Sequence, residues 1–340
     1  MVRVFLSFFS GVSDVNNINA IPCFYETFIQ GLNKNGNEVF AFVSKTFGKD
    51  FENIPRDLLL EIKNFQPEIV ILFNNAFYDI SQEVDCPIFI YEVDSPLYYS
   101  NKKQLKQNVD RYKFIVVQEE SVKILKNEFK VSDKNILIAP FFTEIKNEDI
   151  GIKQNISFIG TKFISSLNRT PYSLFMENDP NEQEKNIYKM LIQEIEKEPF
   201  LSKEELFKKY DVKSDLINKY FNPSDIIFYL SDFNRIKTLS AVADFGIKIY
   251  GTSNWVSDNY NEPLLVLNYD KTPIYSIKDN QNVYNSSKIG ININHLQAKQ
   301  GFSWRVCDIM ASGACLVSEY KSDLVKYFKD IDLPIFKTPD

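Results

Sequence analysis

Histidine and paired cysteines, on which metal and thiol chemistry most depends, are scarce in this sequence. It contains one histidine, and its cysteines, Cys23, Cys86, Cys307 and Cys315, form no C-x-x-C pair. One histidine excludes histidine-rich metal sites and argues against a Ser-His or Cys-His triad, and there is no G-x-S-x-G or G-x-x-x-x-G-K-[ST] motif. The scattered cysteines predict neither a zinc site nor a disulfide framework, so no metal is expected and the expected location is the reducing cytoplasm.

The chain also lacks a basic surplus and long apolar runs. Its 39 Lys+Arg stand against 45 Asp+Glu, a net charge of −6, so nucleic acid is not an expected partner. No apolar run approaches the roughly 20 residues of a membrane helix, and the N-terminus predicts a strand instead of a signal peptide. Basic clusters such as Lys102 to Lys106 alternate with acidic ones, which is typical of a solvated helix; peripheral membrane contact is the alternative.

What the sequence does contain is an alternation of short apolar strands and amphipathic helices. Val2 to Phe9 predicts a strand, Phe24 to Leu32 a helix that stops at Asn35-Gly36, and Glu38 to Val43 the next strand. Such a crossover requires parallel strands. Further apolar strands are predicted at Ile69 to Phe73, Ile88 to Tyr91, Phe114 to Val117 and Asn135 to Ile138. Unbroken apolar strands belong to sheets covered on both faces, so residues 1–145 predict one doubly wound α/β domain.

A second domain of the same class is predicted over residues 155–340. The polar stretch Lys146 to Gln154 is the expected linker, and a strand ending at Gly160-Thr161 follows it. More strands are predicted at Ile247 to Tyr250, Ile289 to Ile293 and Ala314 to Val317. The segment Glu182 to Tyr220 is dense in Glu and Lys with apolar residues at helical spacing, so a helical insertion is expected at about 175–230.

The segment Tyr284 to Glu319 holds the densest group of candidate binding residues. Ser287-Lys288 precedes a predicted strand, and a loop containing Gly301 leads into a predicted helix over Trp304 to Ala311. Helix N-termini carry unpaired N–H groups and partial positive charge, so a diphosphate can bind there, with Gly301 permitting close approach. Arg305 and Lys288 would contact phosphate, and Asp308 a sugar or ribose hydroxyl. The alternative is that Arg305 and Asp308 only pair with each other at i, i+3.

Two further strand ends in this domain are candidates. The single histidine, His295, follows a predicted strand and could donate to phosphate or sugar or carry a proton; the alternative is a structural histidine. At the other strand end, Gly251 can adopt positive φ, and Tyr250 or Trp255 could cover a base ring. An aromatic core beside a turn is an equally good interpretation.

The first domain offers a carboxylate and a loop. Asp94, with Glu92 beside it, follows a predicted strand and could serve as a general base toward an acceptor hydroxyl. The alternative is a turn-forming Asp before Ser95-Pro96. Gly11 lies in the first strand-to-helix loop, but without G-x-G-x-x-G this is a weak phosphate signal.

At these residues the sequence resembles the GT-B glycosyltransferases, in particular the CgeB-like group related to spore-maturation glycosyltransferases. The matching motifs, in order, are EVDSP at 92–96, NISFIGT at 155–161, NRIKTLSAVADFGIKIYGTSNW at 234–255, SSKIGININ at 286–294 and GFSWRVCDIMASGACLVSEY at 301–320. The resemblance implies two Rossmann-like domains, a nucleotide-diphosphate sugar held mainly by the second, an acceptor held mainly by the first, and catalysis without metal. It places Lys288 and Arg305 at the diphosphate, Asp308 at the donor sugar or ribose, and Asp94 on the acceptor side.

The sequence departs from that group at three points. Cys307 stands where the group tends to have an aromatic residue, Asp308 where many relatives have Glu, and the chain ends at Asp340, before the expected closing helix. The expected function is transfer of a sugar from a nucleotide-diphosphate sugar to a hydroxyl of a glycan, lipid or protein, in bacterial cell-surface glycan synthesis, with no cofactor besides the donor substrate. Two alternatives remain open: a non-catalytic nucleotide- or glycan-binding module, and a sugar-nucleotide epimerase or hydrolase. Retention or inversion, the donor base and the sugar also stay open.

Overall fold

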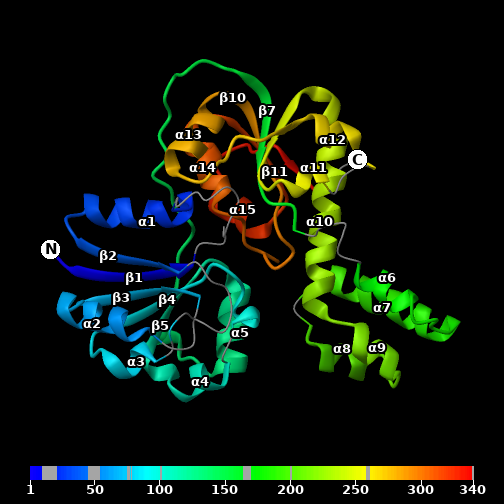
Figure 1. Ribbon diagram of the computed structural model, residues 1–340, viewed down its shortest axis with the longest axis horizontal. Helices are drawn as coiled ribbons and strands as arrows, with labels where there is room; N and C mark the ends of the chain where they lie inside the picture. The colour runs from blue at the N-terminus through cyan, green and yellow to red at the C-terminus, as the bar shows by residue number, and fades with distance from the viewer. Residues whose placement is uncertain are drawn as a thin grey trace.

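A computed structural model describes residues 1–9, 21–44, 54–74, 77, 79–99, 102–163, 170–199, 201–257 and 261–338. They form two α/β domains and a helical lobe beside the second domain (Figure 1). The predicted loop position Gly11 lies outside the described residues.

The first domain is a parallel sheet with helices on both faces. Its described strands lie in the order β2-β1-β3-β4-β5-β6, and all described pairs are parallel. The strands are β1 (Arg3–Phe9), β2 (Glu38–Ser44), β3 (Ile69–Phe73), β4 (Ile88–Tyr91), β5 (Tyr112–Val116) and β6 (Ile136–Ile138). The helices are α1 (Cys23–Lys34), α2 (Arg56–Phe65), α3 (Ile80–Glu83), α4 (Lys102–Gln107) and α5 (Glu119–Phe129), with 3-10 turns η2 (Pro96–Tyr98), η3 (Val109–Arg111) and η4 (Asp133–Asn135).

Side-chain alternation along β1 explains why helices cover both faces of this sheet. Phe5 packs into one buried apolar cluster, and its neighbours Val4 and Leu6 pack into the other. Because successive side chains of a strand point to opposite faces, an all-apolar strand is stable only between two layers.

The second domain repeats this architecture after an extended segment, residues 139–153. Its described strands lie in the order β12-β11-β10-β7-β8-β9, and all described pairs are parallel. The strands are β7 (Gln154–Ile159), β8 (Ile247–Tyr250), β9 (Tyr269–Asp270), β10 (Ser287–Asn292), β11 (Cys315–Glu319) and β12 (Ile335–Phe336). The helices after β8 are α11 (Asn254–Ser257), α12 (Pro263–Leu267), α13 (Ile277–Asn285), α14 (Arg305–Ser312) and α15 (Ser322–Tyr327).

The helices between β7 and β8 form the lobe, which extends away from the second sheet in Figure 1. They are α6 (Pro171–Met176), α7 (Glu182–Lys197), α8 (Lys203–Lys209), α9 (Asp215–Tyr220) and the long α10 (Pro223–Ala241), followed by η5 (Ala243–Phe245). Capping boxes at Asn181 and Ser202 begin α7 and α8. The lobe has its own apolar core, in which the rings of Phe175 and Tyr188 stack with centroids 4.3 Å apart.

The predicted fold class, two doubly wound α/β domains with helices inserted in the second, is therefore confirmed. The two domains meet along α1 and α13. The backbone N–H of Ile277 donates to Glu26 Oε2 at 2.7 Å, and the ring of Trp304 stacks on Phe24 at 4.8 Å. Within the described residues, no helix has both the length and the apolar character needed to cross a membrane.

Candidate functional site at the carboxyl edge of the second sheet

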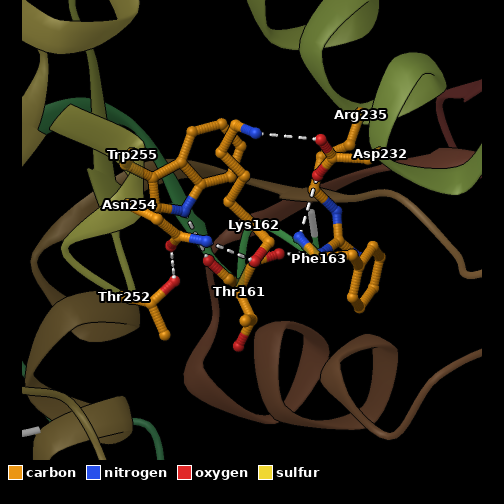
Figure 2. A network of polar contacts seen from close by, with 9 residues as sticks. Thr161, Lys162, Phe163, Asp232, Arg235, Thr252, Asn254 and Trp255 are labelled. Atoms are coloured by element: carbon orange, nitrogen blue, oxygen red, sulfur yellow. Dashed lines mark hydrogen bonds and ion pairs between the residues drawn. The ribbon is translucent and has the colours of Figure 1, made fainter. Parts of the chain in front are cut away.

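Open parallel α/β sheets bind ligands outside the carboxyl ends of their strands. In the second domain this edge is built from residues 160–163 after β7, 251–254 after β8, 320–321 after β11, and residues 293–304, here named the β10–α14 loop. Helix α10 of the lobe runs past the same edge and contributes Asp232 and Arg235 (Figure 2).

Arg235 is a buried cation that ties two strand ends together. Its side chain is 2% exposed, and its guanidinium donates to the backbone oxygens of Thr161 and, at 3.4 Å, Ile293. The guanidinium carbon lies 4.1 Å from the ring centroid of Phe163. Burial lowers the pKa of Arg235 to about 9, with repulsion from Arg305 next in size, and its Nε atom has no hydrogen-bond partner among the described residues.

Lys162 and Asp232 form a buried ion pair beside Arg235. Lys162 Nζ lies 3.1 Å from Asp232 Oδ2, and Asp232 Oδ1 accepts a hydrogen bond from the Phe163 N–H at 2.8 Å (Figure 2). Asn254 Nδ2 donates to the Lys162 backbone oxygen at 2.9 Å. The carboxylate of Asp232 is thus committed to Lys162 and to the loop after β7.

Gly251 permits two strand ends to approach closely. A Cβ atom at this position would lie 2.1 Å from the Gly160 oxygen, and Trp255 Nε1 donates to that same oxygen at 2.8 Å. Trp255 is fully buried, so it packs in the core instead of covering a base ring. The predicted glycine requirement at Gly251 therefore has a structural explanation within the chain.

Arg305 begins α14 and is the clearest candidate for binding an anion. It is half-buried, and its guanidinium forms no hydrogen bond or ion pair with any residue that the structure describes; it lies 5.1 Å from the ring centroid of Trp304. The alternative interpretation, an Arg305–Asp308 ion pair, is not found.

Lys321 is a second such cation, which the sequence analysis missed. It lies two residues after β11 and is 8% exposed; among the described residues nothing forms a hydrogen bond or ion pair with its ammonium. Burial lowers its pKa, opposed by Glu319. The rule that selected His295, a polar residue just after a strand, would also have selected Lys321. Arg235, Arg305 and Lys321 therefore leave positive charge at this edge that no described carboxylate contacts directly.

His295 lies in this neighbourhood as a neutral residue. Its ring packs edge-to-face against Phe163 and Phe228, with centroids 4.7 Å and 4.8 Å away. Nδ1 accepts from the Gln297 N–H at 3.2 Å, so the proton of the neutral ring belongs on Nε2, which has no partner among the described residues. Burial, and then the charges of Arg235 and Lys321, lower the pKa of His295 to about 3. This disfavours the predicted role as proton carrier.

Three predicted donor-binding residues do not reach this edge with their side chains. Ser287 and Lys288 begin β10, so they lie at the amino end of the strand, opposite the carboxyl edge. Ser287 Oγ donates to the Val283 oxygen at 2.6 Å, and Lys288 is exposed. The hydroxyl of Tyr250 donates to Oε1 of Gln154, the first residue of β7, at 2.7 Å. Lys288 and Arg305 are therefore not brought together.

Two others contact the first domain. The Gly301 N–H donates to Gln118 Oε1 at 3.1 Å. Asp308 is 2% exposed and accepts hydrogen bonds from Thr143 Oγ1 at 2.5 Å and from Cys23 Sγ at 3.9 Å. Burial raises the pKa of Asp308 to about 6. At 2% exposure, Asp308 presents almost no surface to a sugar or ribose hydroxyl in this arrangement.

Asp94 faces the second domain from the end of β4. It is half-buried; Oδ1 accepts from Gln297 Nε2 at 2.7 Å and Oδ2 from Asn74 Nδ2 at 2.9 Å. Its neighbour Glu92 is instead buried inside the first domain, where burial raises its pKa to about 7. Of the two predicted carboxylates, Asp94 is therefore the one that lies at the domain boundary. Within the described part of the chain, no group of three or more His, Cys, Asp and Glu is arranged to hold a metal ion.

Part of the second domain is similar in sequence to a known family. Residues 234–340, which include Arg235, Arg305 and Lys321, match a family model described as glycosyl transferase-like. No curated protein matches the chain in sequence.

Several solved structures are similar to the chain at low identity. A glycosyltransferase from Rickettsia africae is 11% identical and covers 100% of this chain and 85% of its own, with a TM-score of 0.42. The Anabaena protein HepE, solved with UDP and glucose, is 10% identical and covers 99% and 86%, with a TM-score of 0.42. WaaG, a glycosyltransferase involved in lipopolysaccharide biosynthesis, is 7% identical and covers 96% and 84%, with a TM-score of 0.43. Likenesses this remote assign no role to any residue.

Proposed function

We propose that the protein is a glycosyltransferase of the GT-B type that transfers a sugar from a nucleotide-diphosphate sugar to an acceptor hydroxyl. The observation that carries this proposal is the positive charge of Arg235, Arg305 and Lys321 at the carboxyl edge of the second sheet, where none of the three forms an ion pair with a described carboxylate. The similarity of residues 234–340 to a glycosyl transferase-like family supports it, because the same residues fall within the match.

In this mechanism the second domain stabilises the leaving group. Breaking the bond between sugar and diphosphate develops negative charge on the diphosphate, and cations already held at that position stabilise it without reorganising. Arg305 supplies a planar pair of donors for phosphate oxygens, and Lys321 adds a point charge. With three cations for this task, we propose that the reaction needs no metal and no cofactor besides the donor substrate.

The acceptor is placed on the first-domain side, near Asp94. This carboxylate would take the acceptor's proton in an inverting reaction, once Gln297 releases Oδ1. We propose a glycan, a lipid-linked glycan or a protein as the acceptor, and a bacterial cell-surface glycan as the product, in keeping with the resemblance to the CgeB-like group. The free thiols of Cys23, Cys86, Cys307 and Cys315 support a cytoplasmic location.

One observation favours a second candidate, a nucleotide-binding module without catalysis. The two oxygens of Asp94 are both engaged, and the low pKa of His295 makes it a weak base, so neither of these two candidates is ready to take a proton in this arrangement of the domains. Calorimetry with a panel of nucleoside diphosphates, followed by hydrolysis assays on the matching nucleotide sugars, separates the two. Binding with turnover supports the transferase, and binding without turnover of any donor or acceptor supports the module.

Arg305 provides the direct test of the diphosphate position. Arg305→Ala is expected to weaken nucleoside diphosphate binding by about 1.5–3 kcal/mol, roughly 10- to 150-fold in Kd, because a charge-assisted hydrogen bond is lost. Lys288→Ala is the matched control, since Lys288 is an exposed cation at the opposite end of β10. Equal affinities of the wild type and Arg305→Ala, with the fold intact, would place the diphosphate elsewhere.

A further inference from the structure

The β10–α14 loop is held by its own domain at one end. The Asn294 N–H donates to Glu319 Oε2 at 2.9 Å, and the Leu296 N–H donates to Ser231 Oγ at 3.0 Å. These contacts tie the first residues of the loop to β11 and to α10, whatever the position of the first domain.

The later part of the loop is held from both domains. Within the second domain, the Gln300 oxygen accepts from the Asp323 N–H at 3.1 Å, and the Ser303 N–H donates to Asn294 Oδ1 at 3.0 Å.

The first domain adds the contact of Gln118. Gln118 Oε1 accepts hydrogen bonds from the backbone N–H groups of Gln300 at 3.3 Å and Gly301 at 3.1 Å. The contact is close, because a Cβ atom on Gly301 would lie 3.1 Å from Gln118 Cβ. Gln118 is the residue before α5, so this contact joins the carboxyl edge of the first sheet to that of the second.

The orientation of the Gln118 amide is fixed from behind by Glu92. Gln118 Nε2 donates to Glu92 Oε1 at 3.4 Å, and Glu92 also accepts from the Val117 N–H at 2.8 Å and from Ser121 Oγ. Glu92 and Gln118 are 1% and 4% exposed. Since the Gln300 and Gly301 N–H groups can only donate, the amide turns its oxygen toward the loop and its NH₂ toward Glu92.

The loop leads into Arg305, the first residue of α14, four residues after Gly301. We propose that Gln118 is a positioning residue: by holding the Gln300 and Gly301 N–H groups, it adds to the contacts within the second domain a restraint on the segment before Arg305 that is present only when the two domains are closed. This inference rests on the proposed function for the role of Arg305. The first domain then takes part in donor chemistry without contacting the donor. Sugar transfer is thereby coupled to domain closure.

The expected signature is a split between binding and turnover. The open protein binds a nucleoside diphosphate through the second domain, so Gln118→Ala should change the Kd for UDP or another bound diphosphate, and the donor KM, by less than about threefold. The same variant should lower kcat roughly tenfold or more, because misplacing a stabilising group by about 1 Å is enough for such a loss. A merely structural role would instead lower the amount of folded protein and leave kcat per folded molecule unchanged.

Hydrogen exchange on the 340-residue chain tests this contact independently of activity. In Gln118→Ala the amides of Gln300 and Gly301 should exchange roughly tenfold faster or more, since they lose the acceptor, while Asn294 and Leu296 keep theirs and serve as internal controls. Gln104→Ala, an exposed glutamine on α4 of the same domain, is the matched control.

A second variant tests the same contact in case Gln118→Ala does not fold. Gly301→Ala pushes the loop away from Gln118 and leaves Glu92 untouched, and it should reproduce both the faster exchange and the lower kcat. Unchanged exchange at Gln300 and Gly301 in both variants would overturn the proposal, as would faster exchange with an unchanged kcat. If the wild type transfers no sugar, the proposed function fails, and the exchange measurement still decides whether Gln118 holds the loop.

Discussion

At the scale of single residues, burial moves the pKa of Arg235, His295 and Lys321 in the same direction. All three pKa values are lowered, because desolvation disfavours the protonated form. Repulsion by Arg305 also lowers the pKa of Arg235, and repulsion by Arg235 and Lys321 lowers that of His295. On the proposed function, a diphosphate bound at this edge would oppose these shifts, since its negative charge favours protonation of each group.

His295 offers a test of this electrostatic picture, because it is the only histidine in the sequence. With a pKa of about 3, it should stay neutral above about pH 5. The ring-proton NMR signals of the free protein should therefore not titrate between roughly pH 5 and pH 8, the range in which an ordinary histidine changes charge.

The denatured protein is the control for that measurement, since its histidine is solvated and should titrate near pH 6.5. A titration in the folded protein with a midpoint between pH 6 and pH 7 would mean that His295 is hydrated, and would restore it as a candidate proton carrier.

At the scale of secondary-structure elements, the geometry of the site depends on how closely the ends of β7 and β8 approach. The Gly251 position admits no side chain, because a Cβ would lie 2.1 Å from the Gly160 oxygen that accepts from Trp255. Gly251→Ala is expected to destabilise the protein by more than about 3 kcal/mol, since backbone and a fully buried Trp must both shift. Chemical denaturation followed by Trp fluorescence measures this loss.

Gly36→Ala is the matched comparison. Gly36 also has positive φ, at 74°, but a Cβ there would meet nothing within 4 Å. Its expected cost is about 1 kcal/mol, from backbone conformation alone. Equal losses in the two variants would show that backbone conformation, and not the contact with Gly160, explains Gly251.

The strands were predictable because each is a short apolar run between polar segments. Ile69–Phe73 and Ile88–Tyr91 begin and end where expected. Because such strands are buried on both faces, all their residues are apolar, and the first polar residue or proline on each side marks the end of the strand. The two-residue strand β9 was missed because it is too short to show a period.

The site was less predictable, because its residues come from segments far apart in the sequence that only the folded sheet brings together. Lys288 was expected near the phosphate from its place before a strand, but β10 begins at Ser287, which puts Lys288 at the opposite edge. Gln118 and Arg235 lie far from the loop in sequence, and nothing local in their segments shows that they contact it. Arg305 was found because a glycine-containing loop before a helix is a local signal.

At the scale of the whole molecule, Asp308 is a buried charge between the two domains. It accepts hydrogen bonds from Thr143 in the segment that joins the domains and from Cys23 at the start of α1. Burial raises its pKa from 3.8 to about 6, even though both hydrogen bonds and Arg305 act in the other direction. The charged form therefore opposes the packing of α14 on the first domain.

The sign of the pH dependence follows from this raised pKa. The folded protein binds the Asp308 proton more tightly than the unfolded chain does, so the contribution of Asp308 is most favourable below about pH 4 and is lost as the pH rises through 6. A shift of about two pH units corresponds to roughly 3 kcal/mol at pH 8. Asp308→Asn keeps an acceptor for Thr143 without the charge. This variant should be more stable than the wild type by up to about this amount at pH 8, and by about half as much at pH 5.

Denaturation at the two pH values measures the difference in stability between Asp308→Asn and the wild type, with Asp330→Asn, at an exposed position, as the control. An advantage of Asp308→Asn that is the same at both values, or a loss, would show that Asp308 is ionised without penalty between the domains, held by its neighbours as part of the closed arrangement.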